Sequence, residues 1–300
     1  MQKWLKAFRL RTLPLALSSI ILGSFLAYAS GFYNWKVTVL AIFTTIFLQV
    51  LSNLANDYGD TVSGVDNENR VGPTRSMQAG EITKKEMKIA LIIFILLSLI
   101  SGLWLIYEGT KGLYLGYGLI FFLLGIAAIG AAIKYTMGKN PYGYMGLGDV
   151  FVFLFFGLTG VLGTFYLHTH QMNWEIILPA STIGFLSTAV LNLNNMRDRI
   201  NDKASGKNTL VVKLGIEKAK IYHFSIVILA ILSALVFTII NYFSWYQLIF
   251  LVVLPVLINN LRIVYHHKNP ASLDPELKKI ALGTLLFAVT FGLGLILEYA

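Results

Sequence analysis

Nine long stretches without a single Asp, Glu, Lys or Arg run through this 300-residue chain and constrain its fold more than any other feature. Each is long enough to cross the hydrocarbon core of a bilayer as a helix, which takes about 20 apolar residues. The bilayer core offers no water to satisfy the backbone, so apolar runs of this length form helices and not barrel strands. We therefore expect an all-α polytopic membrane protein with nine transmembrane helices. The stretches are Leu13–Ala29, Val37–Ala55, Ile89–Tyr107, Leu113–Ile133, Val150–Leu167, Ile176–Leu193, Ile221–Ile240, Trp245–Leu261 and Ile280–Leu297.

The composition fits a membrane-embedded chain and excludes several classes of function. Charged residues make up 13% of the chain, whereas soluble domains contain about 25%. Nine spans leave no room for a large soluble domain, so we expect one membrane-embedded domain over residues 1–300. Cysteine is absent, which excludes disulfides, a thiolate nucleophile and Cys-ligated metals. The net charge of +9 reports orientation in such a chain, and we expect no nucleic-acid partner.

The distribution of basic residues predicts the orientation in the membrane. Of the 24 Lys and Arg residues, 22 precede the first stretch or fall in alternate connections, and only Lys36 and Lys111 fall in the others. By the positive-inside rule the N-terminus is cytoplasmic and the C-terminus lies outside. We expect a multi-pass protein of the cell (inner) membrane with its chemistry on the cytoplasmic face. A cleaved signal peptide is the alternative for the first stretch, but Leu13–Ala29 is longer than the usual apolar region of such a peptide.

A first polar cluster follows the second stretch, at its cytoplasmic end. If the helix continues through this cluster, four polar side chains at positions i, i+3, i+4 and i+7 share one face. They are Asn53, Asn56, Asp57 and Asp60, and Asp66 follows them. Carboxylates one turn apart repel each other unless a positive charge holds them, and no Lys or Arg lies between Asp57 and Asp60. This spacing favours a bound divalent cation.

A second polar cluster follows the sixth stretch at the same membrane face. Asn195, Asp198 and Asp202 fall at i, i+3 and i+7 there, so they too share one helix face. Both clusters begin Asn-Leu-x-Asn, which predicts two acidic helix ends that face each other. The alternative is that interfacial Asp and Asn side chains only cap helix ends.

Two separated acidic motifs predict two Mg²⁺ ions that hold one diphosphate. Mg²⁺ prefers one or two carboxylates and fills its other positions with water and phosphate oxygens. Cations that such a substrate needs surround the motifs, and the cytoplasmic connections carry a positive net charge that attracts an anion. The candidate cations are Arg70, Arg75, Lys134, Lys139, Arg197, Lys203 and Lys207.

At these residues the sequence resembles the UbiA-type membrane prenyltransferases. Their two aspartate-rich motifs match Asn56-Asp57-x-x-Asp60 with Asp66, and Asp198-x-x-x-Asp202. Within the family the sequence is most similar to the branch that acts on 1,4-dihydroxy-2-naphthoate in menaquinone biosynthesis. Three segments carry this narrower similarity, and they are Asn56 to Arg75, Tyr142 to Gly157 and Asn194 to Leu210.

The resemblance implies a role for each motif residue. Four carboxylates are implied to hold Mg²⁺ on a polyprenyl diphosphate, and three amides are implied to support them. The carboxylates are Asp57, Asp60, Asp198 and Asp202, and the amides are Asn53, Asn56 and Asn195. A Tyr-x-x-x-Lys diphosphate contact of the family matches Tyr135 to Lys139. The reaction implied is transfer of the polyprenyl group to the ring carbon of 1,4-dihydroxy-2-naphthoate that bears the carboxylate, with loss of CO₂ and diphosphate.

Three residues are candidates for positioning or deprotonating the aromatic acceptor: Asp66, Arg75 and Asp149. Asp149 departs from the pattern, since a Glu is expected at its position in this branch.

Two other functions stay open. A sister prenyltransferase would use another acceptor, such as 4-hydroxybenzoate or haem, with the same fold and metal site. A membrane transporter would place ionisable groups near the membrane midplane, whereas here no span contains a formal charge.

Overall fold

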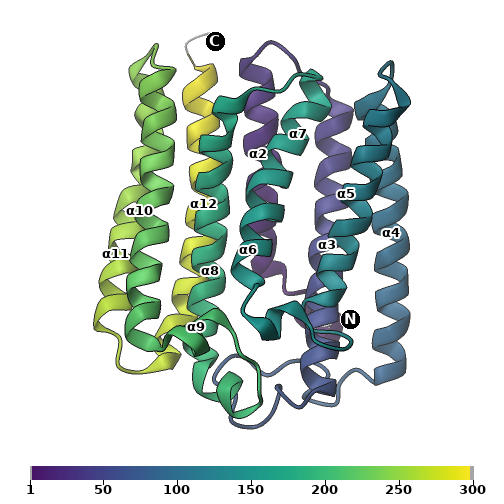
Figure 1. The fold of residues 1–300 in the computed structure, drawn as a ribbon, viewed down its shortest axis with the longest axis vertical. Helices are drawn as coiled ribbons and strands as arrows, with labels where there is room; N and C mark the ends of the chain where they lie inside the picture. Colours follow the sequence, from purple (N-terminus) through teal and green to yellow (C-terminus); the bar gives the residue numbers. More distant parts are fainter. Residues whose placement is uncertain (1, 298–300) are drawn as a thin grey trace.

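The computed structural model describes residues 2–297, and all regular secondary structure in this part of the chain is helical, without a strand. Nine helices or helix series are long and apolar enough to span a membrane, which confirms the predicted number. They run side by side with nearly parallel axes, and the two chain ends lie at opposite ends of the bundle (Figure 1). The single-helix spans are α2 (Leu13–Ala29), α3 (Trp35–Val62), α4 (Lys84–Thr110), α5 (Leu115–Lys134), α8 (Ile177–Ala204), α10 (Ile216–Ile240) and α12 (Asp274–Ile296).

Two spans change helix type within their uncharged stretch, and the other short helices lie at the ends of spans or in the connections. The fifth span joins α6 (Gly148–Val152), the π-helix η3 (Phe153–Thr159) and α7 (Gly160–Thr169). The eighth joins the 3₁₀ helix η5 (Trp245–Val253) and α11 (Leu254–His266). The short helices are α1 (Gln2–Phe8), η1 (Leu10–Thr12), η2 (Tyr142–Met145), η4 (Trp174–Ile176), α9 (Leu210–Leu214) and η6 (Pro270–Leu273).

The helices that carry the acidic motifs extend beyond their uncharged stretches. α3 continues to Val62 and α8 to Ala204. The predicted continuation of the helix through the first polar cluster is therefore confirmed. The next helix after α3 begins at a capping box, in which Thr83 accepts from the Glu86 backbone N–H and Glu86 accepts from that of Thr83. The chain between these two helix ends forms a connection of about 20 residues over the end of the bundle that carries the acidic motifs.

The broken fifth span packs against α8 backbone to backbone. A Cβ atom added to Gly157 in η3 would lie 2.7 Å from the Cα of Gly184 in α8. Only glycine allows this approach, because any side chain at Gly157 would collide with the facing helix. The wider π-helical turn lies at this contact, in keeping with the tendency of π-bulges to mark special packing sites. The contact fixes α8 at the centre of the bundle.

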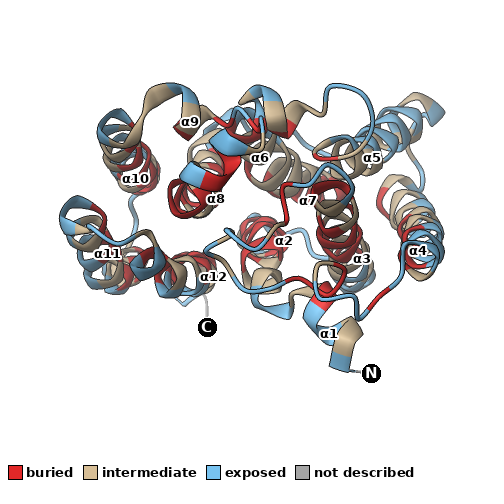
Figure 2. Ribbon diagram, turned by 90° about the horizontal axis from the view of Figure 1, so that it is seen from below, coloured by how far each residue is buried: buried red, intermediate tan, exposed pale blue. Residues whose placement is uncertain are grey.

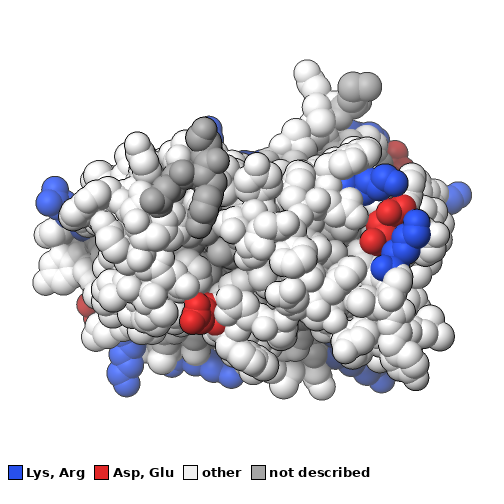
Figure 3. All heavy atoms as spheres, turned by 90° about the horizontal axis from the view of Figure 1, so that it is seen from above, with Lys and Arg blue, Asp and Glu red and all other residues white. Residues whose placement is uncertain are grey.

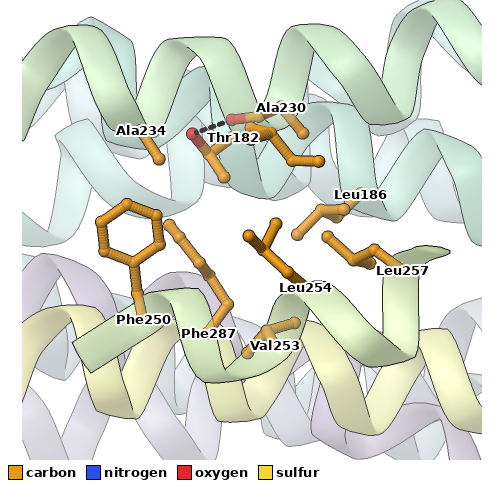
Figure 4. A pocket seen from close by; sticks show the side chains of 10 residues that line it. Thr182, Leu186, Ala230, Ala234, Phe250, Val253, Leu254, Leu257 and Phe287 are labelled. Carbon is orange, nitrogen blue, oxygen red and sulfur yellow. Dashed lines mark hydrogen bonds between the residues drawn. The ribbon is translucent and has the colours of Figure 1, made fainter. Parts of the chain in front are cut away.

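The buried residues are concentrated on α2, α8 and α12, and further ones lie on α3 and α10 (Figure 2). By contrast, no described residue of α5 is buried. The larger apolar core surrounds α8, α10 and α12, and a smaller one joins α1, α3 and α4. The larger core contains a cavity of about 10 Å³ lined by side chains such as Phe250, Leu254 and Phe287 (Figure 4). This volume is a packing gap about the size of one water molecule and not a ligand site.

A chain of buried polar side chains crosses the larger core. Asn192 of α8 donates to Nδ1 of His223 at 3.4 Å, and the other ring nitrogen of His223 lies 2.9 Å from Oδ1 of Asn260. Asn260 in turn donates to Glu276 at 3.0 Å. Hydrogen bonds across an apolar core hold four helices in one register, because leaving any member unpaired there is costly. The chain therefore holds α8 against α10, α11 and α12.

The two ends of the bundle differ in charge. The end that carries the C-terminal end of α12 is covered mainly by uncharged side chains (Figure 3). Both acidic helix ends and the long connections lie at the opposite end, near the N-terminus (Figure 1).

Candidate active site

The four motif carboxylates gather at one end of the bundle, the end near α1. Asp57 and Asp60 lie near the end of α3, and Asp198 and Asp202 lie near the end of α8. Each is at most 5% exposed. Buried carboxylates require paired cations or a metal, because an isolated charge away from water is very costly.

Asp60 is the most heavily paired of these carboxylates. Nη1 of Arg75 lies 2.7 Å from its Oδ2, and Nζ of Lys207 lies 3.2 Å from both of its oxygens. The hydroxyl of Tyr144 donates to Oδ1 at 2.7 Å. Lys207 belongs to the connection after α8, so this ion pair joins the two motif helices.

Arg70 joins the two motifs a second time. Its Nε lies 3.3 Å from Asp66, and its Nη2 lies 3.6 Å from Asp198. Asp66 is also 2.8 Å from Arg75. Asp198 accepts two hydrogen bonds from Arg197, at 2.9 and 2.7 Å. The prediction that the two acidic ends face each other is thus confirmed by the cross-links. We call the following residues the ion cluster: Asp57, Asp60, Asp66, Asp198, Asp202, Arg70, Arg75, Arg197 and Lys207.

Burial and neighbouring charges together shift the pKa values of two residues in the connection after α3, Asp66 and Arg75, and of Tyr144 in η2. Burial raises the pKa of Asp66, and the charges of Arg75 and Arg70 oppose that shift. Burial also lowers the pKa of Arg75, but Asp60 and Asp66 outweigh it, so that the pKa is raised and Arg75 stays charged. Burial and the charge of Asp60 raise the pKa of Tyr144, which therefore remains a hydrogen-bond donor.

Two motif carboxylates have room for a further partner. Oδ1 of Asp57 is buried without a hydrogen-bond partner, and Asp202 forms no ion pair within the described residues. The donors here are carboxylate and amide oxygens, which suit a hard cation such as Mg²⁺. Across residues 2–297 no three His, Asp or Glu side chains converge on one metal position. This arrangement fits an ion that takes one or two protein ligands and completes its shell with water and phosphate.

The predicted amides lie at the site but make structural contacts. Asn53 donates to the carbonyl of Phe8 at 2.9 Å and to the hydroxyl of Thr12 at 3.0 Å. Asn56 accepts from Thr136 at 3.3 Å, and its backbone carbonyl accepts from Arg75. Asn195 is buried on α8. Asn53 therefore ties the N-terminal segment to α3.

The predicted lysines of the connection after α5 lie apart from the ion cluster. Lys134 and Lys139 are exposed, and Lys134 donates to the backbone carbonyl of Lys139. Lys203 is exposed as well. Tyr135, by contrast, points inward, since a Cβ at Gly148 would lie 3.0 Å from its ring. Burial raises the pKa of Tyr135, and the charges of Asp149, Asp60 and Asp202 add to that shift.

Asp149 lies at the start of α6, away from the ion pairs. It is buried, its Oδ1 has no hydrogen-bond partner, and its side chain interacts with Tyr222 of α10. Arg197, by contrast, already has several partners besides Asp198, because it pairs with Asp274 and donates to Asn194 at 2.8 Å.

Sequence reasoning missed Tyr144, Tyr222 and Arg9 as site residues. Tyr144 lies in η2, Tyr222 in α10, and Arg9 in the turn between α1 and η1. All three are distant in sequence from both motifs, so spacing alone gives no signal for them. A weak signal was available for Tyr144, which falls in one of the segments that carried the family resemblance.

Comparison with known proteins identifies the family. The sequence pattern of the UbiA prenyltransferase family matches residues 16–288. The chain belongs to the UbiA prenyltransferase family. It is 46% identical to a 1,4-dihydroxy-2-naphthoate octaprenyltransferase of Haemophilus influenzae, over 99% of this chain and 96% of that protein. It is 44% identical to the enzyme of the same name from Escherichia coli, with the same coverage.

Solved structures of UbiA homologues share the fold. The apo structure of a UbiA homologue from Aeropyrum pernix superimposes with a TM-score of 0.69 at 12% identity, over 96% of this chain and 98% of that one. A homologue from Archaeoglobus fulgidus, bound to GPP and Mg²⁺, gives a TM-score of 0.65 at 18% identity, over 96% and 99% of the chains. The all-α UbiA-like bundle predicted from the sequence is thereby confirmed.

Proposed function

We propose that this UbiA-family chain transfers a polyprenyl group from polyprenyl diphosphate to 1,4-dihydroxy-2-naphthoate, with release of CO₂ and diphosphate. The observation that carries the proposal is the ion cluster, in which two buried carboxylate pairs on α3 and α8 are cross-linked by cations. The 46% and 44% identity to naphthoate octaprenyltransferases, over nearly the whole chain, supports the choice of acceptor.

The carboxylates of the two motifs would hold the metal. Asp57 and Asp60 would bind one ion and Asp198 and Asp202 the other. Bound Mg²⁺ would neutralise the departing diphosphate and favour its release. The homologue solved with GPP and Mg²⁺ supports this choice of ion.

The cations of the cluster would bind the diphosphate oxygens. Arg70, Arg197 and Lys207 are already at the carboxylates and would exchange part of that contact for phosphate oxygens. Tyr135 would add a hydroxyl from the inner wall. Lys134 and Lys139, which are exposed, would attract the anion from solution.

The acceptor would lie between the cluster and α6. The bond from the allylic carbon to the diphosphate oxygen breaks, and that carbon bonds to the ring carbon that bears the carboxylate. The electron pair of the ring–carboxylate bond returns to the ring as CO₂ leaves, so no ring proton is removed. Asp149, with its unpartnered oxygen, would accept a hydrogen bond from a ring hydroxyl. Asp66 and Arg75 pair with each other, so they would shape the site from the side of the long connection.

We further propose that residues 1–300 form one catalytic domain in the cell membrane, with the ion cluster facing the cytoplasm. The 22 of 24 Lys and Arg residues in the inner segments support this orientation. The lipid bilayer would hold the polyprenyl tail, while the aromatic acid would arrive from water.

Carboxyl-labelled 1,4-dihydroxy-2-naphthoate tests the reaction directly. Purified protein with Mg²⁺ and a polyprenyl diphosphate should release the label as CO₂ in amounts equal to the diphosphate formed. Carboxyl-labelled 4-hydroxybenzoate serves as the matched acceptor and should give no prenylated product. Prenylated naphthoate that keeps the label, or turnover of the benzoate alone, contradicts the proposal.

A further inference from the structure

Arg9 adopts a backbone conformation that is unusual for a residue other than glycine. It lies in the turn between α1 and η1 with φ 48° and ψ 56°, in the left-handed region. L-residues with a side chain avoid this region because Cβ approaches the backbone oxygen. Such conformations persist where the surroundings fix them, and they cluster at functional sites.

The guanidinium group of Arg9 lies at the ion cluster without a partner. Its Nη2 is buried and has no hydrogen-bond partner. The turn that carries Arg9 lies against α3 beside the first motif, because Asn53, one helical turn before Asp57, donates to the carbonyl of Phe8 and to the hydroxyl of Thr12. Nevertheless, no ion pair within 4 Å joins Arg9 to Asp57 among the described residues. Arg9 and Asp57 thus each have a buried polar atom without a hydrogen-bond partner, on neighbouring segments of the bundle.

The other buried cations of the site are already occupied. Arg75 pairs with Asp60 and Asp66, and Lys207 pairs with Asp60. Arg70 and Arg197 pair with Asp198. A buried guanidinium with an unsatisfied N–H costs free energy unless a ligand supplies an acceptor. Arg9 is therefore the cation best placed to receive a substrate without first breaking an ion pair.

We infer that Arg9 binds an oxyanion of a substrate, with its guanidinium donating to two oxygens. This inference rests on the proposed function, which supplies two oxyanions: the diphosphate of the donor and the carboxylate of the aromatic acceptor. A guanidinium fits both groups, because its fixed pair of N–H donors matches carboxylate and phosphate oxygens.

The test compares R9Q and R9K with R11Q. Arg11 is the matched control because it lies two residues further on in η1, but it is exposed and reaches Asp274 only at 3.7 Å. We expect R9Q to raise KM for one substrate by about 10- to 100-fold, because this is the change in affinity that the loss of a hydrogen bond to a charged group causes. The change in kcat should be smaller. R9K should restore part of this loss, and R11Q should match the wild type.

Binding without turnover separates the two oxyanions. Calorimetry without added metal measures the binding of 1-hydroxy-2-naphthoate, an acceptor analogue that keeps the carboxylate. It shows whether Arg9 binds the carboxylate. Inorganic pyrophosphate with Mg²⁺ reports the diphosphate arm. Weaker binding of either probe to R9Q, but not to R11Q, supports the inference and names the group bound.

Unchanged binding of both probes to folded R9Q overturns the inference, as does an equal loss in R9Q and R11Q. If R9Q fails to fold, R9K provides the test. An R9K variant that binds both probes with wild-type affinity overturns the inference that the guanidinium of Arg9 makes the contact. Failure of the proposed function looks different: the wild type then fails to prenylate the naphthoate, while the pyrophosphate arm still tests Arg9.

Discussion

Asp57 and Asp60 lie one turn apart, yet their environments differ. Asp60 holds Arg75 and Lys207, whereas Asp57 has a free oxygen and no ion pair within the described residues. Removing one partner of a buried ion pair leaves an uncompensated charge, which typically costs about 3–5 kcal/mol. The two motif residues should therefore contribute differently to stability, even if both bind metal.

We predict that D57N and D60N both lose nearly all turnover but differ in stability. D60N leaves two buried cations without their carboxylate, so it should lower the free energy of unfolding by about 3–5 kcal/mol. D57N should stay within about 1 kcal/mol of the wild type, because it breaks no ion pair. Prenyl-transfer assays and denaturant unfolding in mild detergent measure both effects. Full activity in either variant, or activity undiminished by EDTA, contradicts the metal assignment.

The short helix η2 links the segments that follow the two motif helices. Tyr144 donates to Asp60, and its hydroxyl lies 2.7 Å from that of Ser63 after α3. Its backbone carbonyl accepts from Asn208 after α8, and Lys207 lies 5.2 Å from the centre of its ring. The single helical turn of η2 thus connects the end of α3, the segment after α3 and the segment after α8.

Y144F should weaken substrate binding, because it removes a donor to the buried charge of Asp60. A hydrogen bond to a charged group is worth about 1.5–3 kcal/mol, so KM for the polyprenyl diphosphate should rise by at least about tenfold. Y142F is the matched control in the same helix, since its hydroxyl donates only to the backbone carbonyl of Ala131. Steady-state kinetics of both variants measure the effect. Equal kinetics in Y144F and Y142F contradict a link through Asp60.

The elements differ in how far the sequence reveals them. The nine spans were predictable because a bilayer demands long apolar helices, and the motif face of α3 followed from helical spacing. The broken fifth span was not, because Val150–Leu167 is uniformly apolar and the π-helix depends on packing of Gly157 on Gly184. The pairing of the cations was also hidden, since it joins residues far apart in the sequence, such as Asp60 of α3 and Lys207 of the connection after α8.

At the scale of the whole molecule, the nine candidate spans place the first and last described residues at opposite ends of the bundle. The described ends of the bundle differ accordingly, with both acidic motifs and the long connections at one end (Figures 1 and 3). The chain has no cysteine, so a thiol reagent labels only a cysteine that is introduced by mutation. The labelling therefore shows on which side of the membrane that position lies.

We predict that M172C reacts with a membrane-impermeant maleimide in intact cells and that S272C does not. Met172 is exposed in the connection between α7 and α8, whereas Ser272 is exposed in η6, in the connection before α12 at the end of the bundle that carries the ion cluster. Both variants should react after the membrane is permeabilised, which controls for accessibility. Gel detection of the label measures the result. The reverse pattern overturns the predicted orientation and places the ion cluster outside the cell.

The ion cluster together with Arg9 holds as many cationic side chains as carboxylates. The ligands proposed for it are also balanced, since two Mg²⁺ ions match the charge of one diphosphate and one carboxylate. Loading the site with this full set therefore moves no net charge into the protein. A single charge carried across a membrane gains or loses about 2.3 kcal/mol per 100 mV. With these ligands bound as proposed, we therefore expect the voltage of an energised membrane to have little effect on substrate binding or on prenyl transfer.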